Sequence, residues 1–145
     1  MSKRRRGLSA ADLAALRRRG AAERRGHARF EQLVGRALAG VPEPFASHLA
    51  TVAVVIEDEP SAEVRWIEGL RRDETLYGYY EGTPRTAWAA DEVPLPNKIT
   101  IYRFPLEEDF PDPVELEDEV RRTVIHEIAH HLGIDDDRLE ALGLD

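Results

Sequence analysis

The chain has 145 residues, which is enough for one domain with its own hydrophobic core. It contains no cysteine, so disulfides and thiolate metal ligands are excluded and any zinc would be held by His and carboxylate side chains. No apolar run approaches the roughly 20 residues of a membrane span, and the apolar stretch after the basic start is broken by Asp12. We therefore expect neither a transmembrane helix nor a signal peptide, and a cytoplasmic protein.

The net charge of −8 is unevenly distributed along the chain. Residues 1–36 contain 11 of the 20 Lys and Arg but only 3 of the 28 acidic residues, a balance of +8, whereas residues 37–145 carry −16. The acidic part would repel phosphate, which disfavours nucleic-acid binding there. The basic part alone could bind nucleic acid or anionic lipid, although a solvated tail is the commoner role of Arg-rich segments. We predict a basic, flexible extension over 1–29 and a folded domain over 30–145.

The first predicted helix lies inside this extension. Ser9 and Asp12 form a capping-box pattern that indicates a helix over 9–19. Gly20 and Gly26 then predict loose order as far as the start of the folded domain.

A second helix is predicted from residue 30, where apolar side chains recur at helical spacing. Gly40 and Pro42 indicate its end, and a short helical turn is expected around Phe45 and Leu49. The apolar face consists of Phe30, Leu33, Val34, Ala37 and Leu38.

Three strands are predicted in the middle of the chain. The β-branched run 51–56 indicates a central strand buried on both faces, and 75–80 indicates a second strand. Residues 98–104 alternate between apolar and polar, which predicts a half-exposed third strand. Residues 61–73 are ambiguous, with a short helix that turns Val64, Ile67 and Leu70 inward as one interpretation. Residues 83–97 and 107–112 are expected to be loops.

The strongest helix prediction is near the C-terminus. Asp112 suits an N-cap, Pro113 suits the first helical turn, and Gly133 suits the end of the helix. The expected core row is Leu116, Val120, Val124, Ile125, Ile128 and Leu132.

This helix carries the pattern His-Glu-x-x-His at residues 126–130. Residues i and i+4 of a helix share a face about 6 Å apart, so His126 and His130 could bind one metal ion. Glu127 lies about 100° around the helix from His126, which suits a general base acting on a metal-bound water. The pattern alone arises by chance roughly once in fifty such sequences.

A third metal ligand is expected just after the helix, because catalytic zinc usually takes three protein ligands. Gly133 permits a sharp turn, and Asp136 follows at the spacing of the metzincin-like pattern HExxHxxGxx, with Asp in place of the last His. Asp135 and Asp137 are alternatives that the spacing disfavours. The full pattern has a chance frequency of the order of one in ten thousand, which favours a metal site over a solvated His-rich helix face.

Two further roles remain open at this point. His131, at i+4 from Glu127, either orients it or is an ordinary half-exposed histidine. The residue types that could stabilise an oxyanion are present, but the sequence does not place them near the site. They are Tyr77, Tyr79, Tyr80, Tyr102 and Arg103.

With these residues in hand, the sequence resembles the small bacterial zincin-like metallopeptidases over roughly residues 30–145. The likeness is sharpest over 52–60, 76–82, 99–103 and 121–139. It implies an α+β zincin-like fold with an N-terminal helix, a small mixed sheet of three or four strands, and the HExxH helix near the C-terminus. It also implies one Zn²⁺ held by His126, His130 and Asp136, with Glu127 as the base.

The expected activity is hydrolysis of a peptide or protein substrate, with strand 98–104 binding the substrate by strand addition. One alternative is a non-catalytic, zinc-stabilised binding module. Another is a metal-dependent endoribonuclease, but those enzymes carry Gly at the position of Glu127. Two His and one carboxylate also suit manganese, cobalt or iron.

Overall fold

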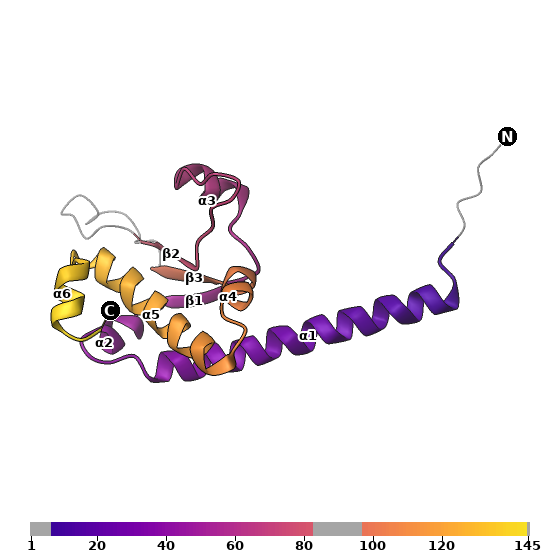
Figure 1. Cartoon of the computed structure of the whole chain (residues 1–145), viewed down its shortest axis with the longest axis horizontal. Coiled ribbons are helices and arrows are strands. Elements are labelled where there is room, and N and C mark those ends of the chain that lie inside the picture. Colours follow the sequence, from indigo (N-terminus) through magenta and orange to yellow (C-terminus); the bar gives the residue numbers. More distant parts are fainter. Residues whose placement is uncertain (1–6, 83–96, 145) are drawn as a thin grey trace. The chain divides into compact units, whose positions relative to one another are not determined.

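The computed structural model describes residues 7–82 and 97–144 and shows an α+β protein (Figure 1). Residues 83–96 of the predicted loop lie outside the described part. The chain separates into two compact units, Met1–Gln32 and Leu33–Asp145. The predicted boundary at residue 30 and the flexibility of the basic extension stay predictions.

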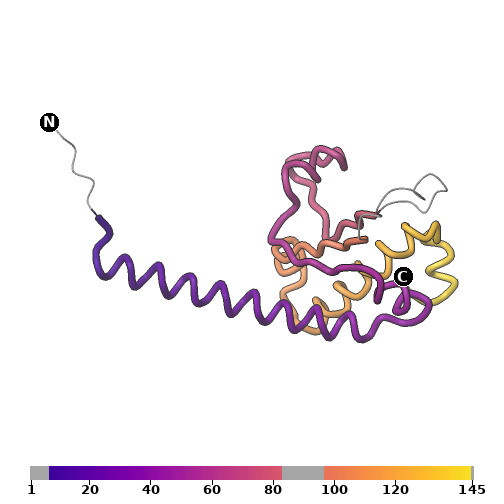
Figure 2. The backbone as a smooth tube through the Cα atoms, turned by 180° about the vertical axis from the view of Figure 1, so that it is seen from behind, coloured from indigo at the N-terminus to yellow at the C-terminus, as the bar shows by residue number. Residues whose placement is uncertain are grey.

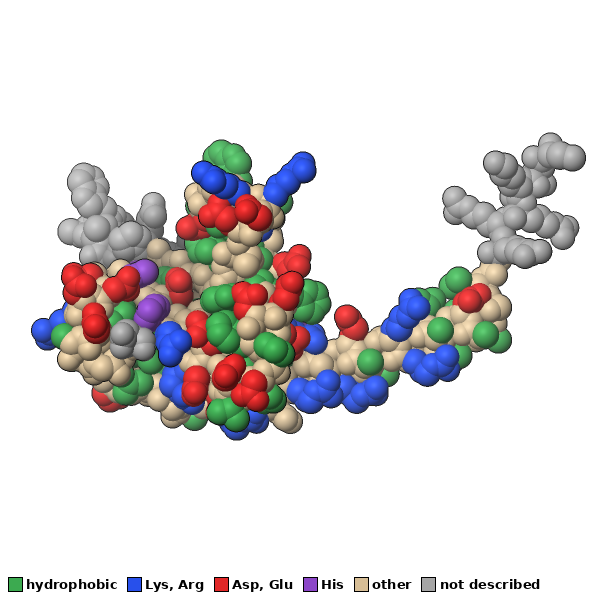
Figure 3. All heavy atoms as spheres, in the orientation of Figure 1, with side chains coloured by type: hydrophobic (Ala, Val, Ile, Leu, Met, Phe, Trp, Pro, Cys, Tyr) green, Lys and Arg blue, Asp and Glu red, His purple; other side chains and the backbone are tan. Residues whose placement is uncertain are grey.

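The first helix, α1 (Ala10–Ala39), is continuous, so the predicted interruption between residues 20 and 29 is wrong. Its start follows the prediction, since the Ser9 side chain accepts a hydrogen bond from the Asp12 N–H at 3.1 Å and Asp12 accepts one from the Ser9 N–H at 3.0 Å. A glycine costs a helix only about 1 kcal/mol. The segment contains no proline and many Ala, Leu and Arg residues, whose helix propensity outweighs that cost. Blue side chains line this helix in Figure 3.

The three described strands form one mixed sheet in the order β1-β3-β2. They are β1 (Ala53–Glu57), β2 (Gly78–Glu81) and β3 (Lys98–Tyr102). β3 pairs with β1 in parallel and with β2 antiparallel. The central strand is therefore β3, and the predictions of a central strand at 51–56 and a half-exposed strand at 98–104 are wrong.

The error has a physical cause in the alternation of β3. Ile99 and Ile101 face one side of the sheet and are fully buried, but Thr100 and Tyr102 on the other side are also buried. The polar atoms of threonine and tyrosine suggested a solvated face, whereas both side chains are almost completely buried.

The sheet register assigns the residues of β2 to its two faces. Tyr80 pairs with Ile99 and Gly78 with Ile101, so these residues share the face toward α5 (Pro113–His131). A Cβ atom at Gly78 would lie 2.8 Å from Thr123 Cγ2 of α5. α5 and β2 are thus in direct contact, and this contact positions the residues described below.

Helix α5 begins and packs as predicted. The Asp112 side chain accepts a hydrogen bond from the Glu115 N–H at 3.0 Å, with Pro113 in the first turn. α2 (Phe45–Leu49) packs against α5, and Phe45 is fully buried. Leu132 is exposed, contrary to prediction, because the helix has ended by that residue. The predicted core residues that are buried are Leu116, Val120, Val124, Ile125 and Ile128.

Two short helices, one before β2 and one after β3 in the chain, differ from prediction. α3 (Ala62–Ile67) buries Val64 but leaves Ile67 exposed, and its segment stands out from the sheet in both backbone views (Figures 1 and 2). α4 (Arg103–Asp109) occupies part of the predicted loop. Its Pro105 does not prevent a helix, because the first-turn N–H groups have no partner inside the helix.

Within the described residues, no helix has the length and hydropathy needed to cross a membrane.

Candidate metal centre and cleft

The last turns of α5 and the strand β2 enclose a small cleft of about 280 Å³. α5 contributes Glu127 and His130 of the His-Glu-x-x-His pattern, and also His131. β2 and the chain just before it form the facing wall. The lining residues are Glu68, Leu76, Gly78, Tyr79, Tyr80, Glu127, His130 and His131.

Glu127 is held in this cleft by the backbone of β2. The Tyr80 N–H donates a hydrogen bond to Glu127 Oε2 at 3.2 Å. Burial raises the pKa of Glu127, an effect that the Tyr80 hydrogen bond and the charge of His130 oppose and the charge of Glu68 reinforces. The carboxylate therefore has a raised proton affinity and a fixed orientation, as a general base requires.

His126 lies one turn before His130 on α5, and its Nε2 atom is buried. Within residues 7–82 and 97–144, this atom has no hydrogen-bond partner. A buried polar atom without a partner costs roughly 1–3 kcal/mol, so native proteins rarely leave one unmatched. An imidazole nitrogen in this state fits a bond to a metal ion.

The turn after α5 brings Asp136 back toward the helix. Gly133 has a φ of +74°, a left-handed conformation that glycine adopts without strain. The Ile134 N–H then bonds to the Ala129 carbonyl at 2.8 Å, which closes the turn. As a result, Asp136 Oδ1 lies 3.7 Å from His130 Nε2, and both side chains are exposed.

Asp135 has a different task, which the sequence did not reveal. It is the N-cap of α6 (Asp136–Ala141), where its carboxylate accepts a hydrogen bond from the Arg138 N–H at 2.9 Å. The cap occupies Oδ1 of Asp135 and fixes its carboxylate at the start of α6, whereas Asp136 lies beside His130, so the structure favours Asp136 for the third position.

The structure brings together only part of the predicted ligand set. His130 and Asp136 are neighbours, but among the described residues no three His, Asp or Glu side chains are grouped as a metal ion would need. The donor atoms themselves, two imidazole nitrogens and a carboxylate oxygen, suit zinc. The ligand set of His126, His130 and Asp136 stays a prediction.

A ring cluster beside the cleft was not foreseen. The rings of Tyr80 and His131 stack with centroids 4.1 Å apart, and the Tyr80 hydroxyl lies 3.3 Å from His48 Nε2 on α2. His131 therefore packs against Tyr80, and the β2 backbone, not His131, orients Glu127. His48 is an isolated histidine in the sequence, and no pattern pointed to it. Figure 3 shows histidines at the surface beside acidic side chains.

Three of the five oxyanion candidates do not line the cleft. The Tyr77 hydroxyl donates a hydrogen bond to Asp109, which raises the pKa of Tyr77 to about 12. Burial raises the pKa of Tyr102 to about 12, and Arg103 forms an ion pair with Glu107 at 3.0 Å. The remaining two, Tyr79 and Tyr80, line the cleft.

A helix with the His-Glu-x-x-His pattern beside the outer strand of a small sheet is typical of zincin-type hydrolases. The comparison of families agrees: residues 49–144 match the family described as zincin-like metallopeptidase. The chain therefore belongs to the zincin-like metallopeptidase family, whose members are zinc-dependent hydrolases. No match was found among curated proteins.

The contact between β2 and α5 leads to a prediction about Gly78. Gly78→Ala should destabilise the fold by about 1–3 kcal/mol, because the new Cβ would meet Thr123 Cγ2 at 2.8 Å. The measurement is the free energy of unfolding in urea.

Two further variants control this experiment. Gly35→Ala in α1, where a Cβ meets nothing within 4 Å, should stabilise by about 0.5–1 kcal/mol. The double variant Gly78→Ala, Thr123→Ser removes Cγ2 and should recover part of the loss. A Gly78→Ala variant as stable as the wild type would contradict the close packing.

Proposed function

We propose that this protein is a zinc-dependent metallopeptidase in which His126, His130 and Asp136 bind one Zn²⁺ and Glu127 acts as the general base. The observation that carries the proposal is the buried, unpartnered Nε2 of His126, one residue before a carboxylate fixed in a cleft. His130 Nε2 and Asp136 Oδ1 lie close together after the turn at Gly133. A cytoplasmic location stays a prediction of the sequence.

The chain's own groups have separable roles in such a reaction. A bound zinc ion would supply a Lewis acid and lower the pKa of water toward about 7. Glu127 would accept a proton from that water and return it to the leaving amine. The Tyr80 N–H keeps the carboxylate directed into the cleft. Of the oxyanion candidates, Tyr80 lies on the sheet face toward α5 and is the one we retain for this role.

The peptide would lie along β2. This strand has β3 on one side, and no other described strand pairs with it. It also forms a wall of the cleft next to Glu127. An extended peptide added to β2 would therefore pass the base directly, which strand 98–104, buried between its neighbours, does not allow.

The first experiment is a measurement of metal content by elemental mass spectrometry, on protein purified without a histidine tag. We expect about one zinc ion per chain. The variant His126→Ala should lose the metal, because it removes the buried nitrogen. Zinc-loaded protein should then cleave members of a peptide mixture, with products identified by mass spectrometry.

Two results would redirect the proposal. Stoichiometric zinc without cleavage of any peptide would favour the zinc-stabilised binding module. Cleavage of structured RNA that His126→Ala abolishes would favour the endoribonuclease. Folded wild-type protein without bound metal would contradict the metal site itself.

A further inference from the structure

Glu68 forms part of the same cleft as Glu127, although it comes from a distant part of the chain. It follows α3 and lines the cleft of about 280 Å³ together with Glu127, His130 and the residues of β2. This volume is near the lower end of the range of about 300–1,000 Å³ that is usual for ligand pockets. Glu68 thus belongs to a small site that also contains Glu127.

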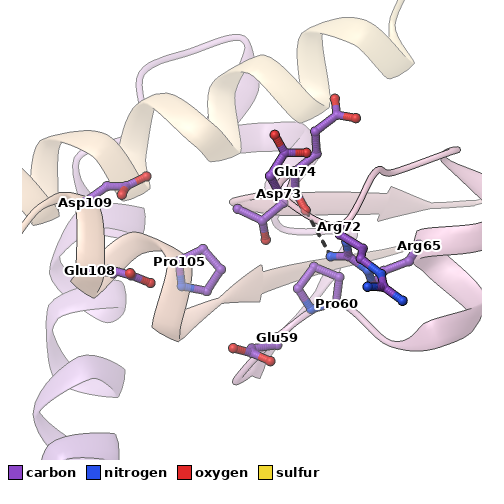
Figure 4. A pocket seen from close by; sticks show the side chains of 10 residues that line it. Glu59, Pro60, Arg65, Arg72, Asp73, Glu74, Pro105, Glu108 and Asp109 are labelled. Atoms are coloured by element: carbon purple, nitrogen blue, oxygen red, sulfur yellow. Dashed lines mark hydrogen bonds between the residues drawn. The ribbon is translucent and has the colours of Figure 1, made fainter.

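The turn that carries Glu68 is braced. Gly69 has a φ of +63°, and the Leu70 N–H bonds to the Arg65 carbonyl at 2.9 Å, which closes the end of α3. The Arg65 guanidinium donates to the carbonyl oxygen of Arg71 at 2.6 Å. It also donates to that of Glu74 at 3.0 Å (Figure 4). The position of Glu68 is therefore fixed by hydrogen bonds on both sides of it.

Glu68 has no evident role in stabilising the fold. Its side chain is exposed, and none of the ion pairs formed by residues 7–82 and 97–144 includes it. It is the C-cap residue of α3, at the end of a helix where a negative charge is unfavourable. A carboxylate at this place remains available to a positive group on a ligand.

The electrostatic surroundings of β2 agree with this role. The charge of Glu68 contributes to the raised pKa of Tyr79, for which burial is the larger cause. Glu81 and Glu63 act on Tyr79 in the same direction. The carboxylates of Glu63 and Glu68 thus act on the residues of β2, and such groups attract basic side chains.

We propose that Glu68 selects substrates with a lysine or arginine at the residue whose side chain enters the cleft. This inference rests on the proposed peptidase function and adds a substrate class to it. A carboxylate opposite a basic side chain in a narrow cleft gives a charge-assisted hydrogen bond, which an acidic or neutral side chain would not form.

The test is the cleavage of a random peptide mixture by the zinc-loaded protein, with cleavage sites mapped by mass spectrometry. We expect Lys and Arg to be enriched about tenfold at one position near the cleaved bond. Glu68→Gln should remove this enrichment, and Glu68→Lys should reverse it in favour of Asp and Glu. The matched control is Glu108→Gln, an equal change of charge in a separate cavity of about 600 Å³, which Figure 4 shows.

The outcomes separate this inference from the peptidase function. Cleavage without a basic preference, or a preference that Glu68→Gln retains, would overturn the role of Glu68 and leave the peptidase intact. If no peptide is cleaved, binding of two peptides that differ by one Lys-to-Glu exchange is compared by fluorescence anisotropy. Equal binding would then overturn the role of Glu68 as well, whereas tighter binding of the Lys peptide that Glu68→Gln removes would support it.

Discussion

Glu127→Gln is expected to lower the rate of peptide hydrolysis by about 10²–10⁴-fold while the zinc content stays unchanged. Glutamine has nearly the same shape as glutamate, and its carbonyl oxygen can still accept the hydrogen bond from the Tyr80 N–H. What it loses is the ability to take a proton from water. The measurement is kcat/KM for a cleaved peptide, together with zinc content by elemental mass spectrometry.

The control for this variant is Glu140→Gln on α6, an exposed carboxylate that is not part of the cleft. It changes the net charge equally and should keep full activity. A Glu127→Gln protein that binds zinc and hydrolyses peptides as fast as the wild type would remove Glu127 from the mechanism. Loss of zinc in this variant would instead make Glu127 part of the metal site.

The helix that carries the site was predictable because its signals are local. The cap at Asp112, the proline at 113 and the apolar row of α5 all act within a few residues of each other, and the structure agrees with them. The turn at Gly133 is local in the same sense. The strands were found with errors of a few residues, since their ends depend on pairing partners as well as on local preference.

The order of the strands was not predictable from local pattern. The run at 53–57 looks more buried than Lys98–Tyr102, yet β3 lies in the centre, because burial of Thr100 and Tyr102 depends on what covers them. This error had a functional consequence. It assigned substrate binding to 98–104, whereas β2 is the strand beside Glu127.

Several residues around the cleft could not be predicted from the sequence, because only long-range contacts define their positions. The hydrogen bond from Tyr80 to Glu127 joins residues 47 positions apart, and that between His48 and Tyr80 joins residues 32 apart. Glu68 is one of 28 acidic residues and has no distinguishing neighbours in the sequence. Spacing rules predict candidate ligands on one helix but do not predict groups that another element contributes.

The proposed third metal ligand, Asp136, gives the second large effect. Asp136→Ala should weaken zinc binding by at least about 100-fold, since even a residue that only orients a ligand is worth 10–100-fold. Asp137→Ala is the matched control, because both aspartates are exposed in the first turn of α6 and affect that helix alike. Zinc affinity is measured by competition with a chromophoric chelator.

Asp135 is the other alternative for the third ligand, and Asp135→Ala tests it through a change in stability. It should destabilise α6 by about 0.5–2 kcal/mol through loss of the N-cap, which circular dichroism and unfolding would detect. Zinc affinity should fall in Asp135→Ala only because the turn becomes less ordered. Asp135→Asn retains a capping oxygen and should therefore restore much of that affinity. If Asp137→Ala loses zinc and Asp136→Ala does not, the chain reaches the metal one residue later than the spacing predicts.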